Sequence, residues 1–451
     1  MSARPIALAV VGTAYHTPTA LDLEVLDDVV ISIDADGVIA GVDPLGTDAA
    51  TARMAAAATV RRLAAHERLL PGLVDLHIHA PQWPQLGTGL DLPLERWLFG
   101  HTFPLEAKYA DLGFAREVWS HMVPTLLAHG TTTAVYFSSI HEEATSALAQ
   151  QCVQSGQRAY VGRVAMDHPE GTPTWYRDES APAGVDASRR SIAAIRSLGA
   201  ALVEPIVTPR FVPACTDELL GALAHLAVDS GTLVQTHCSE SDWEHHAVLD
   251  RSGHSDTTAL HRLGLLRAGT VLAHGNHLGE PDLALIRSAG AGVAHCPMSN
   301  AYFANAVLPV RRLLHAGVKV GLGTDIAGGA EPALLRQCSH AVTMSRVLHD
   351  GVDQRRSSID RGVADSTIDA VTAFHLATVG GADVLGAPVG LFEPGRQFDA
   401  IVVETAAGGA LRAWPQVDDH ARVFEKIVHL AGPAEITTVW VSGRQVVPGR
   451  N

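Results

Sequence analysis

Cysteine is scarce in this chain, and the few cysteines are scattered. There are five in 451 residues, and no two of them form a Cys-x-x-Cys motif. An odd, scattered set does not suit a disulfide framework and favours a reducing compartment. Long hydrophobic runs are also missing, since no stretch approaches the ~20 apolar residues that a membrane-spanning helix needs. These absences predict a cytoplasmic protein with no membrane association.

Positive charge is in short supply as well. Lys and Arg number 33 against 48 Asp and Glu, which gives a formal net charge of −15. A chain this acidic repels nucleic-acid backbones and anionic membrane surfaces, so we expect it to bind neither. Apolar residues make up 47% of the sequence, which is enough for a large core and excludes a disordered chain.

The two ends of the chain are both rich in β-forming residues. The segments are Ile6–Tyr15, Val29–Ile39, Phe398–Val403 and Ile436–Val447. Asp36-Gly37 and Ser442-Gly443 are turn signals next to these segments. We expect the ends to form one small β-sandwich domain together, made of residues 1–68 and 386–451.

Between the ends, short apolar runs alternate with segments of helical pattern such as Thr216–Ser230 and Glu280–Ala289. The eight runs are Gly72–His79, Thr131–Phe137, Ala159–Ala165, Val203–Thr208, Leu233–His237, Val271–His274, Gly292–His295 and Val318–Thr324. Buried Val/Ile/Leu-rich strands separated by helices are typical of a parallel sheet. Eight such units predict an α/β fold, a closed (β/α)₈ TIM-like barrel over residues 69–385.

A doubly wound open sheet is the alternative architecture. Such sheets usually carry a Gly-rich phosphate-binding turn after the first strand. Here the first run is followed by Ala80-Pro81-Gln82, so the barrel is the better interpretation.

Histidine and aspartate occur at the ends of several predicted strands, which is where barrel enzymes place their catalytic residues. The first strand ends with His77 and His79, whose side chains share one face because strand side chains alternate. His237, His274 and Asp325 lie at the ends of the fifth, sixth and eighth strands. Any one of these histidines alone would be a weak signal, but the set predicts a metal site at the barrel mouth.

Imidazole and carboxylate groups are common ligands of Zn²⁺. The expected ligands are His77, His79, His237 and Asp325. A catalytic zinc keeps a position for water and lowers the pKa of that water from ~15.7 towards ~7, which supplies a hydroxide nucleophile. Glu240 follows His237 by three residues, and we expect its carboxyl group to shuttle a proton on the substrate side of the metal.

These residues lie in longer stretches that resemble the amidohydrolase superfamily and, in finer detail, the family of guanine deaminases within it. The resembling stretches are residues 71–82, 88–93, 102–104, 205–211, 294–300, 321–329, 424–430 and 439–447. The His-x-His motif is shared by many hydrolases, whereas the stretch that ends at Phe211 is shared by far fewer proteins. The resemblance extends over most of the chain from the first predicted barrel strand onward.

The resemblance implies the barrel, the composite β-domain and a homodimer. It also implies one zinc ion per subunit on the four ligands named above, with His274 beside the metal-bound water. The fourth predicted strand, Val203–Thr208, carries no lysine, whereas binuclear members of the superfamily bridge two metals with a modified lysine there. We therefore expect a single metal.

Substrate contacts are implied as well, because Gln82, Arg210 and Phe211 match positions that contact guanine. Arg210 could donate to the purine O6, and Gln82 could both donate and accept on another edge of the base. Phe211 or Trp83 could stack on the ring. The other expected substrate-binding residues are His237, Glu240 and Asp325.

The implied reaction is hydrolytic deamination of guanine to xanthine and ammonia, a step of purine catabolism. The zinc-bound hydroxide attacks C2, and Glu240 protonates the adjacent ring nitrogen. Asp325 and His274 orient the water and take its proton. Residues 86–103 are expected to fold over the pocket as part of a lid.

Two alternatives stay open. The same metal centre could act on another aminated ring, such as 8-oxoguanine, a pterin or a triazine, because residues 168–183 depart from the family pattern on the face where a base would bind. The second alternative is a metal-free scaffold protein, since some relatives of these barrels have lost their ligands.

Overall fold

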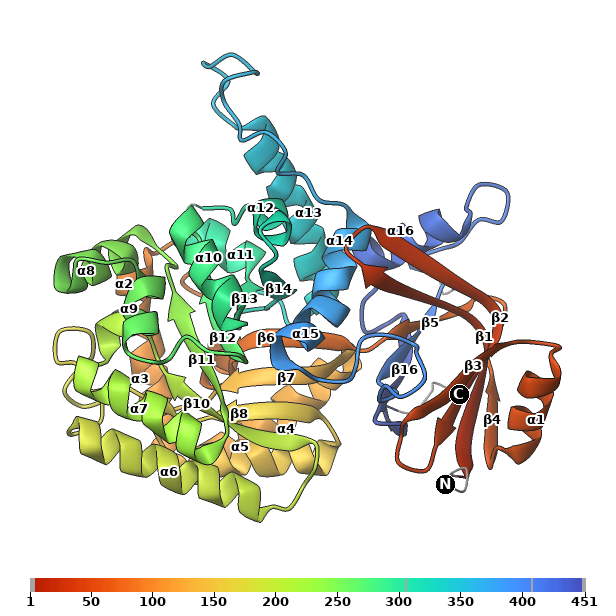
Figure 1. Ribbon diagram of the computed structural model, residues 1–451, viewed down its shortest axis with the longest axis horizontal. Helices are drawn as coiled ribbons and strands as arrows, with labels where there is room; N and C mark the ends of the chain where they lie inside the picture. The colour runs from red at the N-terminus through yellow and green to blue at the C-terminus, as the bar shows by residue number, and fades with distance from the viewer. Residues whose placement is uncertain (1–4, 305, 407–408, 448–451) are drawn as a thin grey trace.

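The computed structural model describes residues 5–304, 306–406 and 409–447. It contains a barrel and a separate β-sheet that lies beside it (Figure 1). Strands from both ends of the chain build this second sheet, as predicted. The outermost residues of the expected β-domain, 1–4 and 448–451, lie outside the described residues.

Eight parallel strands form the barrel wall in the order in which they occur along the chain. They are β6 (Leu73–His79), β7 (Thr131–Phe137), β8 (Arg158–Gly162), β10 (Val203–Pro209), β11 (Leu233–Cys238), β12 (Thr270–His274), β13 (Gly292–His295) and β14 (Lys319–Leu322). A short strand, β9 (Val164–Ala165), also pairs with β10. All eight predicted runs are confirmed as strands, because apolar side chains on both faces suit strands buried between a core and covering helices.

Backbone hydrogen bonds between β6 and the residues that follow β14 close the barrel. The amide of Asp325 donates to the carbonyl of His77 over 2.8 Å, and the amide of His79 donates to the carbonyl of Ile326 over 2.9 Å. The alternative of a doubly wound open sheet is therefore wrong. Closure also brings the ends of β6 and β14 side by side, which places the first and last of the predicted metal ligands together.

Helices cover the outside of the barrel (Figure 1). The longer ones are α4 (Leu112–Ala128), α5 (Glu142–Ser155), α6 (Ala181–Ser197), α7 (Asp217–Ser230), α8 (Asp242–Ser252), α9 (Asp256–Arg262), α10 (Glu280–Ala289) and α13 (Leu334–Asp350). Shorter ones are α2 (Leu94–Trp97), α3 (Phe103–Glu106), α11 (Pro297–Ser299), α12 (Val310–His315), α14 (Ala370–His375) and α15 (Gly381–Leu385). Helix α7 illustrates the local rules, since Thr216 caps its first turn and Gly231 ends it in the left-handed conformation. Both helical segments named from the sequence are confirmed, as α7 and α10.

The second sheet has eight strands drawn from both ends of the chain. They are β1 (Ile6–Thr19), β2 (Asp22–Asp34), β3 (Ile39–Pro44), β4 (Thr59–Arg62), β5 (Glu67–Pro71), β15 (Ala400–Glu404), β16 (Ile436–Val441) and β17 (Arg444–Val447). Side chains from both halves of the sheet share one apolar core, in which Ile31 and Val10 lie with Val402 and Trp440. Helices α1 (Asp48–Ala56) and α16 (His420–Leu430) accompany this sheet.

Two hairpin turns from opposite ends of the chain meet in this sheet. Gly37 has φ +78°, and a Cβ atom added there would lie 2.0 Å from the carbonyl oxygen of Ser442. Glycine is required at such a position both for its positive φ and for the close approach of the second turn. The two turn signals seen in the sequence therefore also fix how the chain ends pair.

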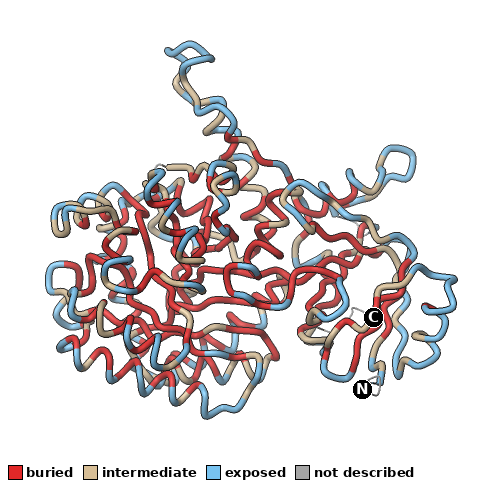
Figure 2. The backbone as a smooth tube through the Cα atoms, viewed as in Figure 1, coloured by how far each residue is buried: buried red, intermediate tan, exposed pale blue. Residues whose placement is uncertain are grey.

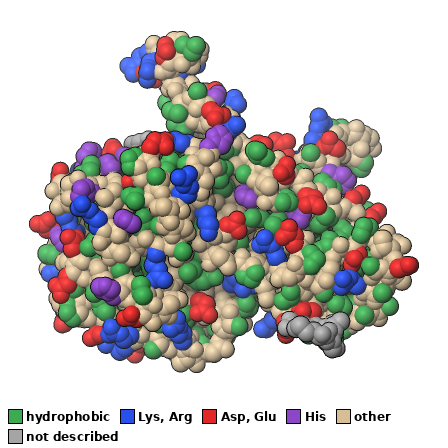
Figure 3. All heavy atoms as spheres, in the orientation of Figure 1, with side chains coloured by type: hydrophobic (Ala, Val, Ile, Leu, Met, Phe, Trp, Pro, Cys, Tyr) green, Lys and Arg blue, Asp and Glu red, His purple; other side chains and the backbone are tan. Residues whose placement is uncertain are grey.

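One segment stands away from the rest of the molecule. The end of α13 and residues 351–366 project from the barrel (Figure 1), and most of these residues are exposed (Figure 2). On the face shown in Figure 3, acidic and basic side chains are interspersed. Among the residues that the structure describes, no helix combines the length and the apolar character needed to cross a bilayer.

Candidate active site

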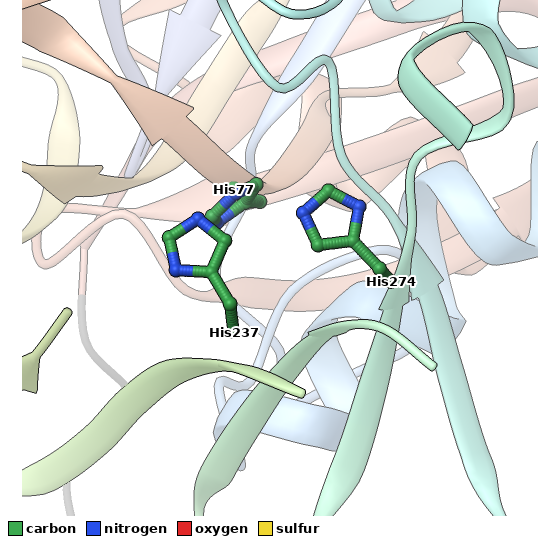
Figure 4. Close-up of side chains that lie close together, drawn as sticks. All are labelled: His77, His237 and His274. Atoms are coloured by element: carbon green, nitrogen blue, oxygen red, sulfur yellow. The ribbon is translucent and has the colours of Figure 1, made fainter. Parts of the chain in front are cut away.

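The predicted ligands converge at the carboxyl ends of the barrel strands. His77 and His79 lie at the end of β6, and His274 ends β12. His237 is the second-last residue of β11. Asp325 follows β14 by three residues. Figure 4 shows the imidazoles of His77, His237 and His274 facing one another across the barrel mouth.

The distances between these side chains are short enough for one ion to bridge them. Nε2 of His79 and Nε2 of His237 are 2.9 Å apart. Oδ1 of Asp325 lies 3.1 Å from Nε2 of His77 and 3.6 Å from Nε2 of His79. The His77–His79–Asp325 group and the His77–His237–His274 group each bring their ligand atoms within 4.8 Å of one another. The structure therefore contains a His/Asp group able to bind a metal ion.

Two of the histidines use Nδ1 as a hydrogen-bond donor. Nδ1 of His237 donates to the carbonyl of Arg210 over 2.6 Å, and Nδ1 of His274 donates to Oδ1 of Asn300 over 2.9 Å. Each bond fixes the tautomer that carries a lone pair on Nε2, as the outer bonds of metal-ligating histidines do. Nε2 of His77 and Nε2 of His274 are buried and have no hydrogen-bond partner among the described residues. Unpaired buried nitrogens that point at a common centre fit a metal ion.

Burial also keeps these histidines neutral. Loss of solvent lowers the pKa of His77, His79 and His237 well below the usual range, and neighbouring imidazoles lower it further. Burial likewise lowers the pKa of His274, although the charge of Asp325 opposes this effect. A neutral imidazole is the form that binds a metal.

Glu240 lies next to the predicted ligands and, with His274 and Asp325, forms a third group of side chains close enough to hold a metal ion. Its Oε1 is 3.7 Å from Nε2 of His274, which in turn is 3.9 Å from Oδ2 of Asp325. Burial raises the pKa of Glu240 well above its usual range, and the nearby charge of Asp325 raises it further. A carboxyl group held protonated next to an acceptor can act as a general acid.

The backbone at three of these strand ends is in the left-handed region. Ser239, His274 and Asp325 have φ values of +54°, +76° and +50°, which non-glycine residues rarely adopt. Such conformations persist where the surrounding structure enforces them, and they gather at functional sites.

Asp75 is a residue of the site that sequence reasoning missed. Its Oδ1 accepts from the amides of His77 and Thr324 over 3.2 and 3.0 Å, and its Oδ2 accepts from the Thr324 hydroxyl over 2.6 Å. Burial raises the pKa of Asp75 to about 7. The side chain thus joins the ends of β6 and β14 directly behind the ligands. In the sequence, the only indication of a role for Asp75 is that it lies within the resembling stretch 71–82.

A pocket opens next to the ligands and Glu240. Its lining comprises His79, Gln82, Leu94, Trp97, Leu98, Arg210, Phe211, His237, Glu240, Phe303, Asp325 and Gly328. A mostly apolar wall with a few polar groups at defined positions is typical of a small-molecule site. Leu94, Trp97 and Leu98 come from the segment that we expected to cover the pocket.

A buried carboxylate orients the polar groups of the pocket. Glu106 receives two hydrogen bonds from the guanidinium group of Arg210, over 2.6 and 3.1 Å. It also accepts from Nε2 of Gln82 and from the hydroxyl of Tyr176, each over 3.0 Å. Arg210 and Gln82 keep further N–H groups that these bonds do not use. The chain gave no sign of Glu106, because it lies 104 residues from Arg210 and is not part of any recognised motif.

The structure places Trp83 away from the pocket lining. Its indole N–H donates to Nδ1 of His121 on the outer side, over 3.1 Å. Gln82 and Trp83 are consecutive in the 3₁₀ helix η1 (Ala80–Gln85), where successive side chains point about 120° apart. Gln82 therefore faces the pocket and Trp83 cannot. Phe211 does line the pocket, and its ring centroid lies 6.0 Å from that of His237.

Comparison with known proteins agrees with this geometry. A model of the amidohydrolase family matches residues 68–446. The chain belongs to the amidohydrolase family. This result confirms the resemblance that the sequence motifs indicated.

Several amidohydrolase relatives match over nearly the whole chain. The probable guanine deaminase of Schizosaccharomyces pombe is 36% identical over 97% of this chain and 82% of its own length. Guanine deaminase of Mus musculus is 35% identical, covering 98% of this chain and 97% of its own. A crystal structure of guanine deaminase from C. acetobutylicum, with guanine bound in its active site, has a TM-score of 0.87 at 28% identity and covers 97% of this chain and 99% of its own.

Proposed function

We propose that this protein hydrolyses guanine to xanthine and ammonia. One observation carries the proposal: a single pocket has the His/Asp group and Glu240 on one side, and Arg210, Gln82 and Phe211 on another. The first side suits hydrolysis of a C–N bond, and the second suits a flat base with polar edges. The similarity to guanine deaminases over nearly the full length of the chain supports this substrate.

We propose zinc as the metal, held by His77, His79, His237 and Asp325. Three imidazole nitrogens and one carboxylate oxygen are a donor set that zinc accepts, and they leave a position for water. When bound, the ion lowers the pKa of that water from 15.7 to about 7.

The protein side chains then divide the proton transfers among themselves. Asp325 and His274 orient the attacking water and accept its proton while the oxygen adds to C2 of the base. Glu240, whose pKa is raised by burial, gives its proton to the adjacent ring nitrogen and then assists the departure of ammonia. His274 lies within 4 Å of both carboxyl groups, so it is placed to return the proton to Glu240.

Arg210, Gln82 and Phe211 orient the base. The free N–H groups of Arg210 are suited to the O6 atom of guanine. Gln82 keeps one N–H donor and the second lone pair of Oε1, whose first lone pair accepts from the amide of Ala327. Phe211 supplies an aromatic face at the pocket wall.

A different aminated ring is the second candidate substrate. Tyr176, from the atypical segment 168–183, donates to Glu106, which in turn holds Arg210 and Gln82. The segment that departs from the family pattern therefore contacts the residues that would read the base. Ammonia release measured with guanine, 8-oxoguanine, a pterin and a triazine separates the two candidates.

Replacing Glu240 tests the proposed chemistry. We expect Glu240→Gln to keep one metal per chain and to lose at least ~10²-fold in kcat, because proton transfer by a positioned side chain contributes 10²–10⁴-fold. Glu218→Gln, on the exposed side of α7, is the matched control. Wild-type turnover in Glu240→Gln would remove this residue from the mechanism.

We further propose that the protein works as a cytoplasmic homodimer in purine catabolism. Five buried, unpaired cysteines support a reducing compartment. The projecting segment exposes Val352, Ile359 and Val363 by 78%, 87% and 52%, and such side chains suit a subunit contact. Light scattering of the purified protein tests the dimer, and a monomer would refute it.

We also propose that the chain divides into a barrel domain, residues 69–385, and a β-domain built from the two chain ends.

A further inference from the structure

A second pair of titratable side chains lies directly behind the turn that carries Glu240. Glu244 comes from the first turn of α8, and Asp256 is the first residue of α9. Both side chains are 0% exposed, and neither lines the pocket. Two buried carboxyl groups in contact are costly, so their retention here requires an explanation.

Each carboxyl group binds one residue of the turn. The amide of Glu240 donates to Oε2 of Glu244 over 2.7 Å, and the hydroxyl of Ser239 donates to Oδ2 of Asp256 over 3.0 Å. Ser239 is one of the residues with a left-handed backbone. The pair therefore holds the turn in the conformation that directs Glu240 to the pocket.

One oxygen atom of each carboxyl group is left without a hydrogen-bond donor among the described residues. These atoms are Oε1 of Glu244 and Oδ1 of Asp256, and both are buried. Burial, the charge of Asp256 and hydrogen bonding with Asp256 all raise the pKa of Glu244, so the two carboxyl groups are neighbours. Two carboxylates that share a buried site cannot both stay ionised. A single proton between these oxygens would satisfy both of them at once.

The surroundings indicate which partner carries the proton. Asp256 begins α9 directly after the N-cap Ser255, so the helix dipole favours a negative charge on it. Nδ1 of His245 lies 3.8 Å from Oδ2 of Asp256 and favours the same charge when protonated. Burial and the neighbouring Asp256 both raise the pKa of Glu244. These effects leave the proton on Glu244.

We propose that Glu244 and Asp256 are positioning residues that share one proton and hold the backbone of Ser239 and Glu240, so that the Glu240 carboxyl group stays at the pocket. An ordinary helix-capping role for Glu244 does not explain these contacts. Ser241 is the N-cap of α8, and a capping-box glutamate would bond the amide of that residue. Glu244 instead reaches the amide of Glu240, one residue earlier, and a cap needs no second carboxyl group.

Native isoelectric focusing tests the shared proton without any use of activity. If the pair carries one charge, Glu244→Gln keeps that charge, because the new amide donates where the proton lay. We expect the native isoelectric point of Glu244→Gln to equal that of the wild type, whereas the exposed control Glu218→Gln loses one negative charge and shifts. Under denaturing conditions both variants should shift alike. A native shift of Glu244→Gln equal to that of the control would overturn the shared proton.

Kinetics test the positioning role, and this part rests on the proposed guanine deamination. We expect Glu244→Gln to retain most of the kcat, within about fivefold. Glu244→Leu should lose about 100-fold in kcat at unchanged KM and unchanged metal content, since the Glu240 amide loses its acceptor and general acid catalysis contributes at least this much. Ser239→Ala, which removes only the second tether, should lose several-fold and covers the case in which Glu244→Leu does not fold.

The two failures are distinguishable. A wild-type protein that does not release ammonia from guanine would contradict the proposed function and leave the isoelectric result standing. An active wild type whose Glu244→Leu and Ser239→Ala variants keep the wild-type kcat would contradict the positioning role.

Discussion

Individual side chains at the pocket depend on a carboxylate that does not line it. Arg210 is 2% exposed, and its charge is balanced by Glu106, which is 1% exposed. Charge-assisted, bidentate bonds of this kind fix the plane of the guanidinium group as well as its position. The edge that Arg210 presents to a base is therefore set by a residue on α3.

Glu106→Gln tests this dependence. Losing the charged acceptor should lower kcat/KM for guanine by about 10–100-fold, because a hydrogen bond to a charged group contributes about 1.5–3 kcal/mol. We expect a rise in KM with unchanged metal content, measured by steady-state kinetics and metal analysis. Glu117→Gln, exposed on α4, is the control. An unchanged KM would mean that Arg210 does not need Glu106.

Strands and helices could be predicted from the sequence where each is marked by a pattern of residues close together in the chain. The eight barrel strands were predicted because each is a short Val/Ile/Leu-rich run, and the ligand positions followed from the rule that active sites lie at carboxyl ends of strands. The orientation of Trp83 depended on an unforeseen 3₁₀ turn, η1. The residues that support the site were not predictable, because their partners are distant in sequence. Glu244 and Glu106 are examples, since helix patterns show which residues are buried but not what those residues meet.

The junction of β6 and β14 yields a prediction at the scale of elements. Asp75 joins the two strand ends behind His77 and Asp325, so Asp75→Asn should loosen both ligands. We expect metal affinity to fall by about 10–100-fold, as for other outer partners of metal ligands. Competition with a chromogenic chelator measures this affinity. Wild-type affinity in the variant would show that the ligands are held by the backbone alone.

The molecule as a whole buries several neutral histidines, and this has a consequence for its stability. His295 is 1% exposed, and burial lowers its pKa to about 3. Below the usual value near 6.5, the unfolded chain binds a proton at this residue that the folded protein does not bind. Stability therefore falls as the pH drops from about 6.5 towards 3.

Urea unfolding between pH 6.5 and 4 measures this effect. We expect His295→Asn to reduce the pH dependence of the free energy of unfolding by about one proton, or ~1.4 kcal/mol per pH unit. The exposed His225 on α7 provides the control variant, His225→Asn. Equal slopes in wild type and His295→Asn would show that His295 is protonated in the folded protein.

The central claim is that one metal ion on His77, His79, His237 and Asp325 enables deamination of guanine. The most direct measurement titrates zinc into metal-free protein while bound zinc and xanthine formation are followed together. We expect xanthine formation to rise linearly and to stop rising at one zinc per chain. Full turnover by metal-free protein, or one bound zinc with no conversion of guanine, would contradict the account.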